Sequence, residues 1–187
     1  MESRKYIVAL GLEYEGTNYL GFQKQKSSKL TIQGLLEAGL KKVANQPIKT
    51  FCSGRTDSGV HALMQVIHFE TNSFRREDEW VRGVNSYLPH DIRLLWSKEV
   101  EESFHARFSA TDRSYRFIIR NSDTPSALWS KRSLYVPKKL DHIAMRKACK
   151  YLLGEHDFTS FRGSGCQSKT AIRNMKKIEI TKNKDLI

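Results

Sequence analysis

The residues most capable of chemistry lie in one short stretch, residues 54–62, which reads G-R-T-D-S-G-V-H-A. It places a carboxylate, Asp57, two positions after a guanidinium, Arg55, between Gly54 and Gly59. Glycine reaches positive φ without a side-chain clash, so the two glycines predict a tight turn that presents Asp57 toward a ligand. A nearby cation favours the charged form of a carboxylate. Asp57 would therefore act as a nucleophile, a base or a metal ligand, and not as a general acid.

The same stretch also has an ordinary structural interpretation. Thr, Asp, Ser and Gly are common turn residues, and Arg55 could be a surface partner of Asp57. His61 could satisfy a local backbone group as readily as it could move a proton. Residues 54–62 alone leave both interpretations open.

Four further blocks accompany this stretch along the chain. They read Y-E-G-T-N-Y-L-G-F-Q-K-Q (residues 14–25), L-P-H-D-I (88–92), F-H-A-R-F-S-A-T-D-R-S-Y-R-F (104–117) and L-L-G-E-H-D-F-T-S-F (152–161). Together with residues 54–62, and in the same order, they resemble the TruA family of tRNA pseudouridine synthases from about residue 6 to about residue 178. Five ordered blocks are much harder to obtain by chance than one.

The resemblance implies an enzyme that isomerises uridine to pseudouridine in the anticodon stem-loop of tRNA and needs no cofactor. Asp57 would be the catalytic carboxylate, with Arg55 beside it, and would either add covalently to the nucleotide or remove the C2′ proton. Tyr115 matches the tyrosine that lies against the target uracil in the family. Its alternation with Phe117 and Ile119 is equally that of a strand in a protein core. The family typically works as a homodimer with one RNA bridging two subunits.

Eight residues are expected to contact the substrate: Tyr115, Arg107, Arg113, Arg116, Phe22, Gln23, His61 and Lys24. The three arginines interleave with aromatic rings, a pattern that resembles an RNA groove offering guanidinium groups to phosphates and rings to extruded bases. Solvated strand faces carry arginines as well.

The remaining basic and aromatic candidates follow the Y-E-G-T block. Lys24, with Lys26 and Lys29, could track backbone phosphates, and a flexible basic loop explains these lysines equally well. Phe22 and Gln23 match a family block near the cleft, and we interpret them as structural or RNA-contacting.

The net charge of +12 and the isoelectric point near 9.7 indicate a polyanionic partner, and nucleic acid is the first candidate. A membrane surface is less favoured because the sequence has no apolar run near 18 residues and no basic amphipathic helix with a wide apolar face. The N-terminus, M-E-S-R-K, lacks a signal-peptide core, so we expect a cytoplasmic protein.

Three cysteines, Cys52, Cys149 and Cys166, are unpaired by count and show no C-x-x-C spacing. This pattern argues against a disulfide framework and against a zinc site, and no other metal site is predicted. We interpret the three as reduced thiols that pack in or near the core.

The periodicity of the first half predicts an α+β fold. We expect strands at 5–14, 48–53, 64–69 and 91–100, a helix capped by Thr31, and a second helix at 76–87. The order β-α-β-β-α-β is that of a ferredoxin-like (RRM-like) unit, an antiparallel sheet with two helices on one face. We assign residues 1–103 to this half, which carries the catalytic loop.

Residues 104–187 predict a second half that is incomplete. A strand at 112–120, a helix at 139–153 and a strand at 170–181 are expected, with residues 121–133 as a linker or mobile loop. Leu186 and Ile187 resemble the beginning of another strand. The resembled family pairs two ferredoxin-like halves, with antiparallel sheets, around one cleft. The resemblance therefore implies that the chain is truncated before a final β-α-β and before the family's C-terminal block, whose Arg or Lys pairs with the catalytic aspartate.

Three functions from different classes remain open from the sequence. The first is a tRNA pseudouridine synthase. The second is a catalytically inactive, truncated RNA-binding remnant of that family. The third is a basic ferredoxin-like protein unrelated to RNA modification, such as a small hydrolase that uses Arg55 and Asp57.

Overall fold

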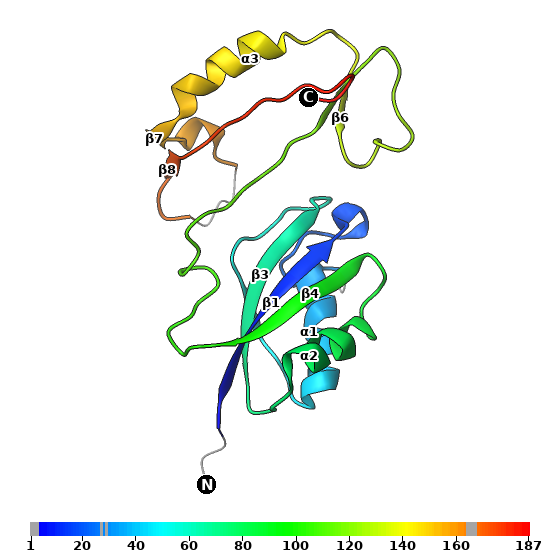
Figure 1. Cartoon of the computed structure of the whole chain (residues 1–187), viewed down its shortest axis with the longest axis vertical. Helices are drawn as coiled ribbons and strands as arrows, with labels where there is room; N and C mark the ends of the chain where they lie inside the picture. The colour runs from blue at the N-terminus through cyan, green and yellow to red at the C-terminus, as the bar shows by residue number, and fades with distance from the viewer. Residues whose placement is uncertain (1–3, 27, 29, 164–167) are drawn as a thin grey trace. The chain divides into compact units, whose positions relative to one another are not determined.

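Strands alternate with helices in the N-terminal part of the chain. The computed structural model describes residues 4–26, 28, 30–163 and 168–187, so the predictions for Lys29 and Cys166 lie outside the described residues. The chain divides into two compact units, Met1–Ser114 and Tyr115–Ile187 (Figure 1). The fold is mixed α/β, with mainly antiparallel sheets and few helices. Among the described residues, no helix is both long and apolar enough to cross a bilayer.

The first unit contains a four-stranded sheet and two α-helices. Its elements are β1 (Tyr6–Tyr14), the 3-10 helix η1 (Gly16–Asn18), α1 (Ile32–Ala44), β2 (Thr50–Cys52), β3 (Ala62–Thr71), α2 (Glu77–Asn85) and β4 (Ile92–Val100). The strand order is β2-β3-β1-β4, and every neighbouring pair is antiparallel. All six strands and helices predicted for this half are confirmed, with boundaries shifted by a few residues.

Helix α1 begins and ends where its sequence predicts. The Thr31 side-chain oxygen accepts a hydrogen bond from the Gly34 N–H at 3.3 Å, which satisfies one of the unpaired donors of the first turn. Leu36 and Leu40 are fully buried on the face turned to the sheet. Asn45 adopts a left-handed conformation with φ 53° and ends the helix.

The core of the first unit lies between the sheet and its two helices, which cover the same face of the sheet in Figure 1. Leu10 and Leu12 of β1 and Ile67 and Phe69 of β3 are fully buried there. The Phe69 ring meets the buried Trp80 ring of α2 edge-on, with centroids 5.1 Å apart. This core fixes the ends of β1, β2 and β3, from which the loops of the candidate site extend.

A segment that follows β4 packs onto the other side of the sheet. The Ala106 N–H donates to Nδ1 of the buried His68 in β3 at 3.1 Å, and the His105 ring lies 4.6 Å from the His68 ring. These contacts tie residues 104–109 to the first unit. The boundary defined by contacts therefore lies between residues 114 and 115, whereas the predicted boundary lies between residues 103 and 104.

The second unit contains short strands and one α-helix. Its elements are β5 (Ile119–Asn121), β6 (Leu134–Val136), α3 (His142–Cys149), the 3-10 helix η2 (Lys150–Leu152), β7 (Gly154–Asp157), the 3-10 helix η3 (Thr159–Phe161) and β8 (Ile172–Met175). Strands β5 and β6 pair in parallel, and β7 and β8 pair antiparallel. The predicted helix at 139–153 corresponds to α3 and η2.

Two strand predictions in this unit are too long. Of the strand predicted at 112–120 only β5 forms, and of the strand predicted at 170–181 only β8 forms. The apolar alternation around Tyr115 and Phe117 does not bury these rings, which are 82% and 73% exposed. Among the described residues, every buried hydrophobic side chain lies in the first unit. An alternating pattern stabilises a strand only where one of its faces is covered.

The last residues of the chain lie beside β5. The Ile119 N–H donates to the Ile187 carbonyl at 2.8 Å, and the Ile187 N–H donates back to the Ile119 carbonyl at 2.9 Å. The Asn121 N–H also donates to the Asp185 carbonyl at 2.7 Å. Leu186 pairs with Arg120 as an isolated antiparallel bridge, so Leu186 and Ile187 make strand-like contacts but do not form the strand predicted to begin there.

Candidate active site

Asp57 lies on the loop that joins β2 to β3, and its side chain is exposed, as is that of Arg55. The Val60 N–H donates to the Asp57 carbonyl at 3.3 Å and closes a tight turn. Gly59 within this turn has φ 78°, a conformation that side chains other than glycine rarely adopt. Positive φ among the described glycines is confined to Gly21, Gly59 and Gly154, so the predicted role of Gly54 as a second such hinge is wrong.

The segment after β1 holds this loop through backbone contacts. The Phe22 N–H donates to the Thr56 carbonyl at 3.0 Å, on the residue before Asp57. The Tyr19 carbonyl accepts from the Ser58 hydroxyl at 3.0 Å and from the Gly59 N–H at 3.3 Å, just after Asp57. The backbone of Asp57 is therefore fixed on both sides while its carboxylate stays accessible.

Two glycines in that segment allow the close approach. A Cβ atom at Gly21, which has φ 86°, would lie 2.8 Å from the Thr56 carbonyl oxygen. A Cβ atom at Gly16 would overlap the Val60 carbonyl oxygen. Any side chain at either position would displace the loop, which explains why the Y-E-G-T-N-Y-L-G-F block carries glycine at both.

His61 contacts the backbone of the same segment. Its Nδ1 atom accepts a hydrogen bond from the Gly16 N–H at 3.2 Å. An accepting Nδ1 carries no proton, so the ring is held in one tautomer when neutral. This geometry favours the structural interpretation of His61.

Tyr14 anchors the end of β1 to the loop. Its hydroxyl is hydrogen-bonded to the Thr56 hydroxyl at 2.8 Å, and the side chain is only 2% exposed. Burial raises the pKa of Tyr14, so its phenol stays protonated at neutral pH. The phenol thus serves as a fixed, uncharged contact one residue before Asp57.

Three of the predicted arginines gather where β2 enters the loop. Arg113 donates through Nε and Nη2 to the Ser53 carbonyl at 2.9 and 2.7 Å, and its Nη2 also reaches the Arg107 carbonyl at 3.1 Å. Burial raises the pKa of the Cys52 thiol, while the positive charges of Arg55, Arg107 and Arg113 oppose that shift. The loop of Asp57 therefore begins in a positive field that suits phosphate.

An exposed ring lies beside these arginines. The Arg107 guanidinium carbon lies 5.7 Å from the centroid of the Phe108 ring, which is 76% exposed. Phe108 is braced by the His105 ring at 4.4 Å, and His105 in turn contacts Phe51 of β2 at 5.6 Å. A guanidinium above an aromatic ring is a surface on which an unpaired base can stack.

Tyr115 and Arg116 begin the second unit, and both side chains are exposed. The structure brings Arg55, Arg107 and Arg113 together with the loop of Asp57 in the first unit. The contacts predicted for Tyr115 and Arg116 with the substrate remain predictions.

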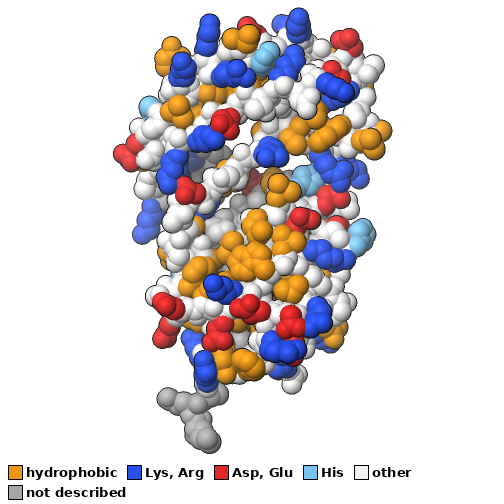
Figure 2. All heavy atoms as spheres, in the orientation of Figure 1, with side chains coloured by type: hydrophobic (Ala, Val, Ile, Leu, Met, Phe, Trp, Pro, Cys, Tyr) orange, Lys and Arg blue, Asp and Glu red, His pale blue; other side chains and the backbone are white. Residues whose placement is uncertain are grey.

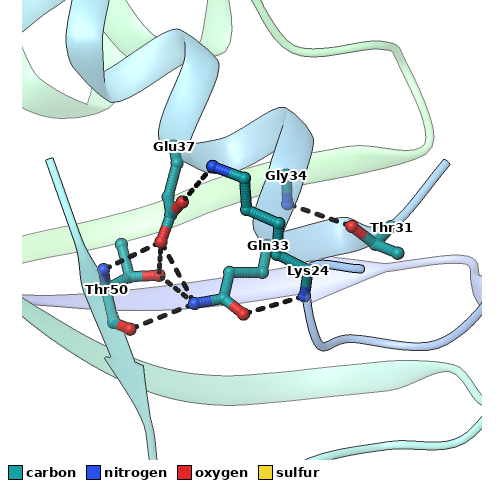
Figure 3. Close-up of polar contacts among 6 residues, drawn as sticks. All are labelled: Lys24, Thr31, Gln33, Gly34, Glu37 and Thr50. Atoms are coloured by element: carbon teal, nitrogen blue, oxygen red, sulfur yellow. Dashed lines mark hydrogen bonds and ion pairs between the residues drawn. The ribbon is translucent and has the colours of Figure 1, made fainter. Parts of the chain in front are cut away.

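Lys24 is tethered by a buried carboxylate (Figure 3). Its Nζ lies 3.0 Å from Glu37 Oε2, and its backbone N–H donates to Gln33 Oε1 at 2.9 Å. The other Glu37 oxygen accepts from the Thr50 N–H at 3.0 Å and from the Gln33 amide at 3.1 Å. These contacts show that Lys24 is not simply part of a flexible basic loop.

The neighbours of Lys24 differ in exposure. Phe22 is 1% exposed and its ring lies 6.3 Å from that of Tyr14 in the core, which favours the structural interpretation. Gln23 is exposed. Figure 2 shows Lys and Arg side chains spread over the face drawn, as the net charge of +12 requires.

Two cavities of the first unit lie elsewhere. One of about 280 Å³ is lined by residues that include Tyr6, Phe74 and Trp80, and one of about 200 Å³ by residues that include Tyr14 and Asp91. Asp57 lines neither. Cys52 and Cys149 are free and half-buried. In the part of the chain that the structure describes, no group of three or more His, Cys, Asp or Glu side chains could hold a metal ion.

Sequence reasoning missed the residues that hold the loop. These are Tyr14, Gly16, Tyr19 and Gly21, together with Asp91, which accepts a hydrogen bond from the Tyr19 hydroxyl. All of them lie in the blocks at 14–25 and 88–92, so the blocks contained the signal. Their individual roles depend on contacts between distant segments.

A family model described as tRNA pseudouridine synthase matches residues 12–109 and 148–187 of this chain. The matched ranges include the loop of Asp57, the segment that holds it, and Arg107. Arg113 lies between the two ranges and is not matched. The match covers well over half of the chain.

Individual relatives are similar over nearly the whole chain. A protein from Coxiella burnetii (strain Dugway 5J108-111) named tRNA pseudouridine synthase A is 49% identical over 173 residues, which cover 92% of this chain and 66% of the relative. Proteins of the same name from Shewanella sp. (strain MR-4) and Buchnera aphidicola subsp. Schizaphis graminum are 49% and 48% identical, covering 94% and 100% of this chain. These two matches cover 67% and 70% of the relatives. The chain spans about two thirds of the length of these relatives.

Proposed function

This chain belongs to the tRNA pseudouridine synthase family, and from that premise we propose that it isomerises uridine to pseudouridine in tRNA with Asp57 as the catalytic carboxylate. The observation that carries the proposal is the loop itself. Residues 14–22 hold the backbone on both sides of Asp57, and the carboxylate remains exposed. A reactive group on a fixed backbone with free access for a ligand is the arrangement that positional catalysis requires. Family membership also removes the unrelated small hydrolase from the candidates.

The reaction breaks the bond between N1 and C1′ of uridine and forms a bond between C5 and C1′. Asp57 would either attack the nucleotide covalently or remove the C2′ proton, and both routes need an ionised carboxylate. The proton that leaves C5 after the new bond forms is taken up by a base or by solvent. Tyr115 is our candidate for stacking on the uracil and assisting this last step, with Arg55 as the cation beside Asp57.

The basic and aromatic groups near the loop support RNA as the substrate. Arg55, Arg107 and Arg113 supply positive charge where β2 ends, and Phe108 offers a ring for an extruded base. Arg116, Lys24 and Gln23 would extend the contact along the phosphate backbone. The anticodon stem-loop is the proposed target, in the cytoplasm.

We further propose that the first unit is a ferredoxin-like half. The order β-α-β-β-α-β along the chain and β2-β3-β1-β4 across an antiparallel sheet supports this assignment. The second unit would supply part of the other half of a catalytic cleft, and two copies of the chain would bind one tRNA as a homodimer.

The proposal is tested by incubating the purified chain with unmodified tRNA and quantifying pseudouridine by mass spectrometry of the digested RNA. We expect product from the wild type and none from Asp57→Asn. Asp123→Asn, which alters an exposed acid in the second unit, serves as the matched control and should leave the yield unchanged. Product from Asp57→Asn would remove this carboxylate from the mechanism.

The same experiment separates catalysis from binding. An inactive RNA-binding member of the family would bind tRNA in a salt-dependent way in a filter or mobility assay and release no product. That outcome would contradict the proposed activity and retain tRNA as the partner.

A further inference from the structure

Tyr19 connects the loop of Asp57 to the beginning of β4. Its backbone carbonyl accepts from the Ser58 hydroxyl and the Gly59 N–H, the two residues that follow Asp57. Its side chain points to a different element, and its hydroxyl donates to Asp91 Oδ1. One residue therefore joins two segments that are 72 positions apart in the sequence.

The Asp91 end of this link is itself fixed. The Glu15 N–H donates to the Asp91 carbonyl at 2.9 Å, which ties this residue to the end of β1. Arg93 donates to the Pro89 carbonyl at 2.7 Å and to the Ile92 carbonyl at 2.8 Å, so its guanidinium stabilises the turn around Asp91. The acceptor of the Tyr19 hydroxyl is therefore held by its own backbone contacts.

The donor end is buried and stays protonated. Tyr19 is 5% exposed, so its ring has little freedom to rotate. Burial raises the pKa of Tyr19, and the Asp91 carboxylate raises it further, so the phenol keeps its proton throughout the neutral pH range. A neutral phenol donating to a carboxylate is a charge-assisted hydrogen bond, stronger than one between two neutral groups.

Resting on the function proposed above, we propose that Tyr19 and Asp91 are positioning residues, whose hydrogen bond fixes the Tyr19 carbonyl and through it the orientation of Asp57. The phenol sets where the Tyr19 backbone lies, and the Tyr19 carbonyl sets where Ser58 and Gly59 lie. The Phe22 N–H completes the clamp at the Thr56 carbonyl, on the other side of Asp57. A displacement of about 1 Å at a catalytic group can reduce a rate by roughly 100-fold.

The test replaces the phenol without changing the ring. Tyr19→Phe removes only the hydroxyl, and Tyr87→Phe, which alters a tyrosine that is 59% exposed, is the matched control. Hydrogen exchange of the Gly59 and Phe22 amides is followed by NMR on the chain without RNA, with the amides of α1 as an internal reference. Turnover of unmodified tRNA is measured in parallel as separate kcat and KM values.

In Tyr19→Phe we expect the Gly59 amide hydrogen to exchange roughly tenfold faster than in the wild type, because the loss of one hydrogen bond makes local opening of the loop easier. The exchange rates of the α1 amides should be unchanged. The kcat should fall about tenfold or more with KM for tRNA within about twofold of the wild type, since a misplaced carboxylate slows chemistry and leaves RNA contacts intact. Tyr87→Phe should match the wild type in both measurements.

Variants of Asp91 provide the second arm in case Tyr19→Phe loosens the whole unit. Asp91→Asn keeps an acceptor oxygen, so the Gly59 amide should still exchange almost as slowly as in the wild type. In Asp91→Ala the Gly59 amide should exchange as fast as in Tyr19→Phe. Wild-type Gly59 exchange in both Tyr19→Phe and Asp91→Ala, or wild-type kcat in both, would overturn the inference.

The experiments distinguish a failure of the proposed activity from a failure of the proposed positioning role of Tyr19 and Asp91. A wild-type chain that makes no pseudouridine contradicts the proposed activity, and the exchange measurements still decide whether Tyr19 and Asp91 position the loop. A wild-type chain that makes pseudouridine at the same kcat as Tyr19→Phe and Asp91→Ala retains the activity and overturns the positioning role.

Discussion

Gly21 illustrates how a single residue limits what the loop of Asp57 tolerates. Its φ of 86° is unfavourable for other residues, and a Cβ atom there would meet the Thr56 carbonyl at 2.8 Å. Both penalties act on the same backbone that precedes Asp57. A change at this position therefore affects stability and catalysis together.

Gly21→Ala is expected to lower the free energy of unfolding by about 1–3 kcal/mol and to reduce pseudouridine formation. Urea denaturation followed by circular dichroism measures the first effect, and the tRNA assay measures the second. Gly163→Ala is the matched control, because a Cβ atom at Gly163 meets no atom within 4 Å. Equal stability of the Gly21 and Gly163 variants would show that the loop accommodates a side chain.

At the scale of residues, the sequence predicts which side chains are chemically reactive better than it predicts which residues contact them in the folded chain. Asp57 and Arg55 stand out because their chemistry is visible in their own side chains and neighbours. Tyr19 does not stand out, because its role depends on Asp91, which lies 72 positions away. The tethering of Lys24 by Glu37 is hidden for the same reason, since only the folded chain brings Lys24 and Thr50 to that carboxylate.

At the scale of elements, β3 and the segment after β4 are joined through a histidine. His68 accepts the Ala106 N–H through Nδ1, and this bond requires an unprotonated nitrogen. Burial lowers the pKa of His68, the neighbouring His105 lowers it further, and Glu70 raises it by a smaller amount. The folded state therefore binds a proton on His68 less readily than the unfolded chain does.

This difference predicts a pH-dependent stability. As the pH falls below about 6.5, the unfolded chain takes up a proton on His68 before the folded chain does. The contribution of neutral His68 is thus complete above about pH 6.5 and is lost as the pH falls toward the lowered pKa of the folded state. Urea denaturation at pH 7.5 and 5.5 should show a smaller pH effect for His68→Gln than for the wild type.

His90→Gln, which alters an exposed histidine, is the control for this measurement and should keep the wild-type pH effect. The same pH effect in His68→Gln and in the wild type would contradict the assignment to His68.

Most elements of the first unit could be predicted because their patterns are long and their faces are covered, whereas β2 has only three residues and is the exception. Residues 32–44 repeat apolar side chains at helical spacing, and β1 and β3 each extend over nine or ten residues. Strands β6 and β7, with three and four residues, carry too few residues for a period to be recognised. The apolar alternation around Tyr115 led to a strand prediction that is too long, because no core of described residues covers either face of that segment.

At the scale of the whole molecule, charge governs the encounter with RNA. The net charge of +12 predicts an affinity for tRNA that falls steeply with salt, because each phosphate neutralised releases counterions. Arg107→Ala should make the negative slope of log K against log salt shallower by about 0.7–0.9, the change for one lost phosphate contact. Fluorescence anisotropy with labelled tRNA at several salt concentrations measures the slope.

Lys139→Ala removes a positive charge from an exposed position in the second unit and serves as the control for net charge. An equal change of slope in both variants would show that Arg107 acts only through the total charge and makes no contact of its own.

The pairing of residues 185–187 with β5 has a consequence for the order in which the protein acquires its structure during translation. The sheet of the first unit has all its strands once Val100 has left the ribosome, so this sheet can form while later residues are still being added. Strand β5 emerges soon afterwards and gains its hydrogen bonds to Asp185 and Ile187 only when these residues have been synthesised. The loop of Asp57 is therefore assembled early, on a nascent chain whose second unit is still unfinished.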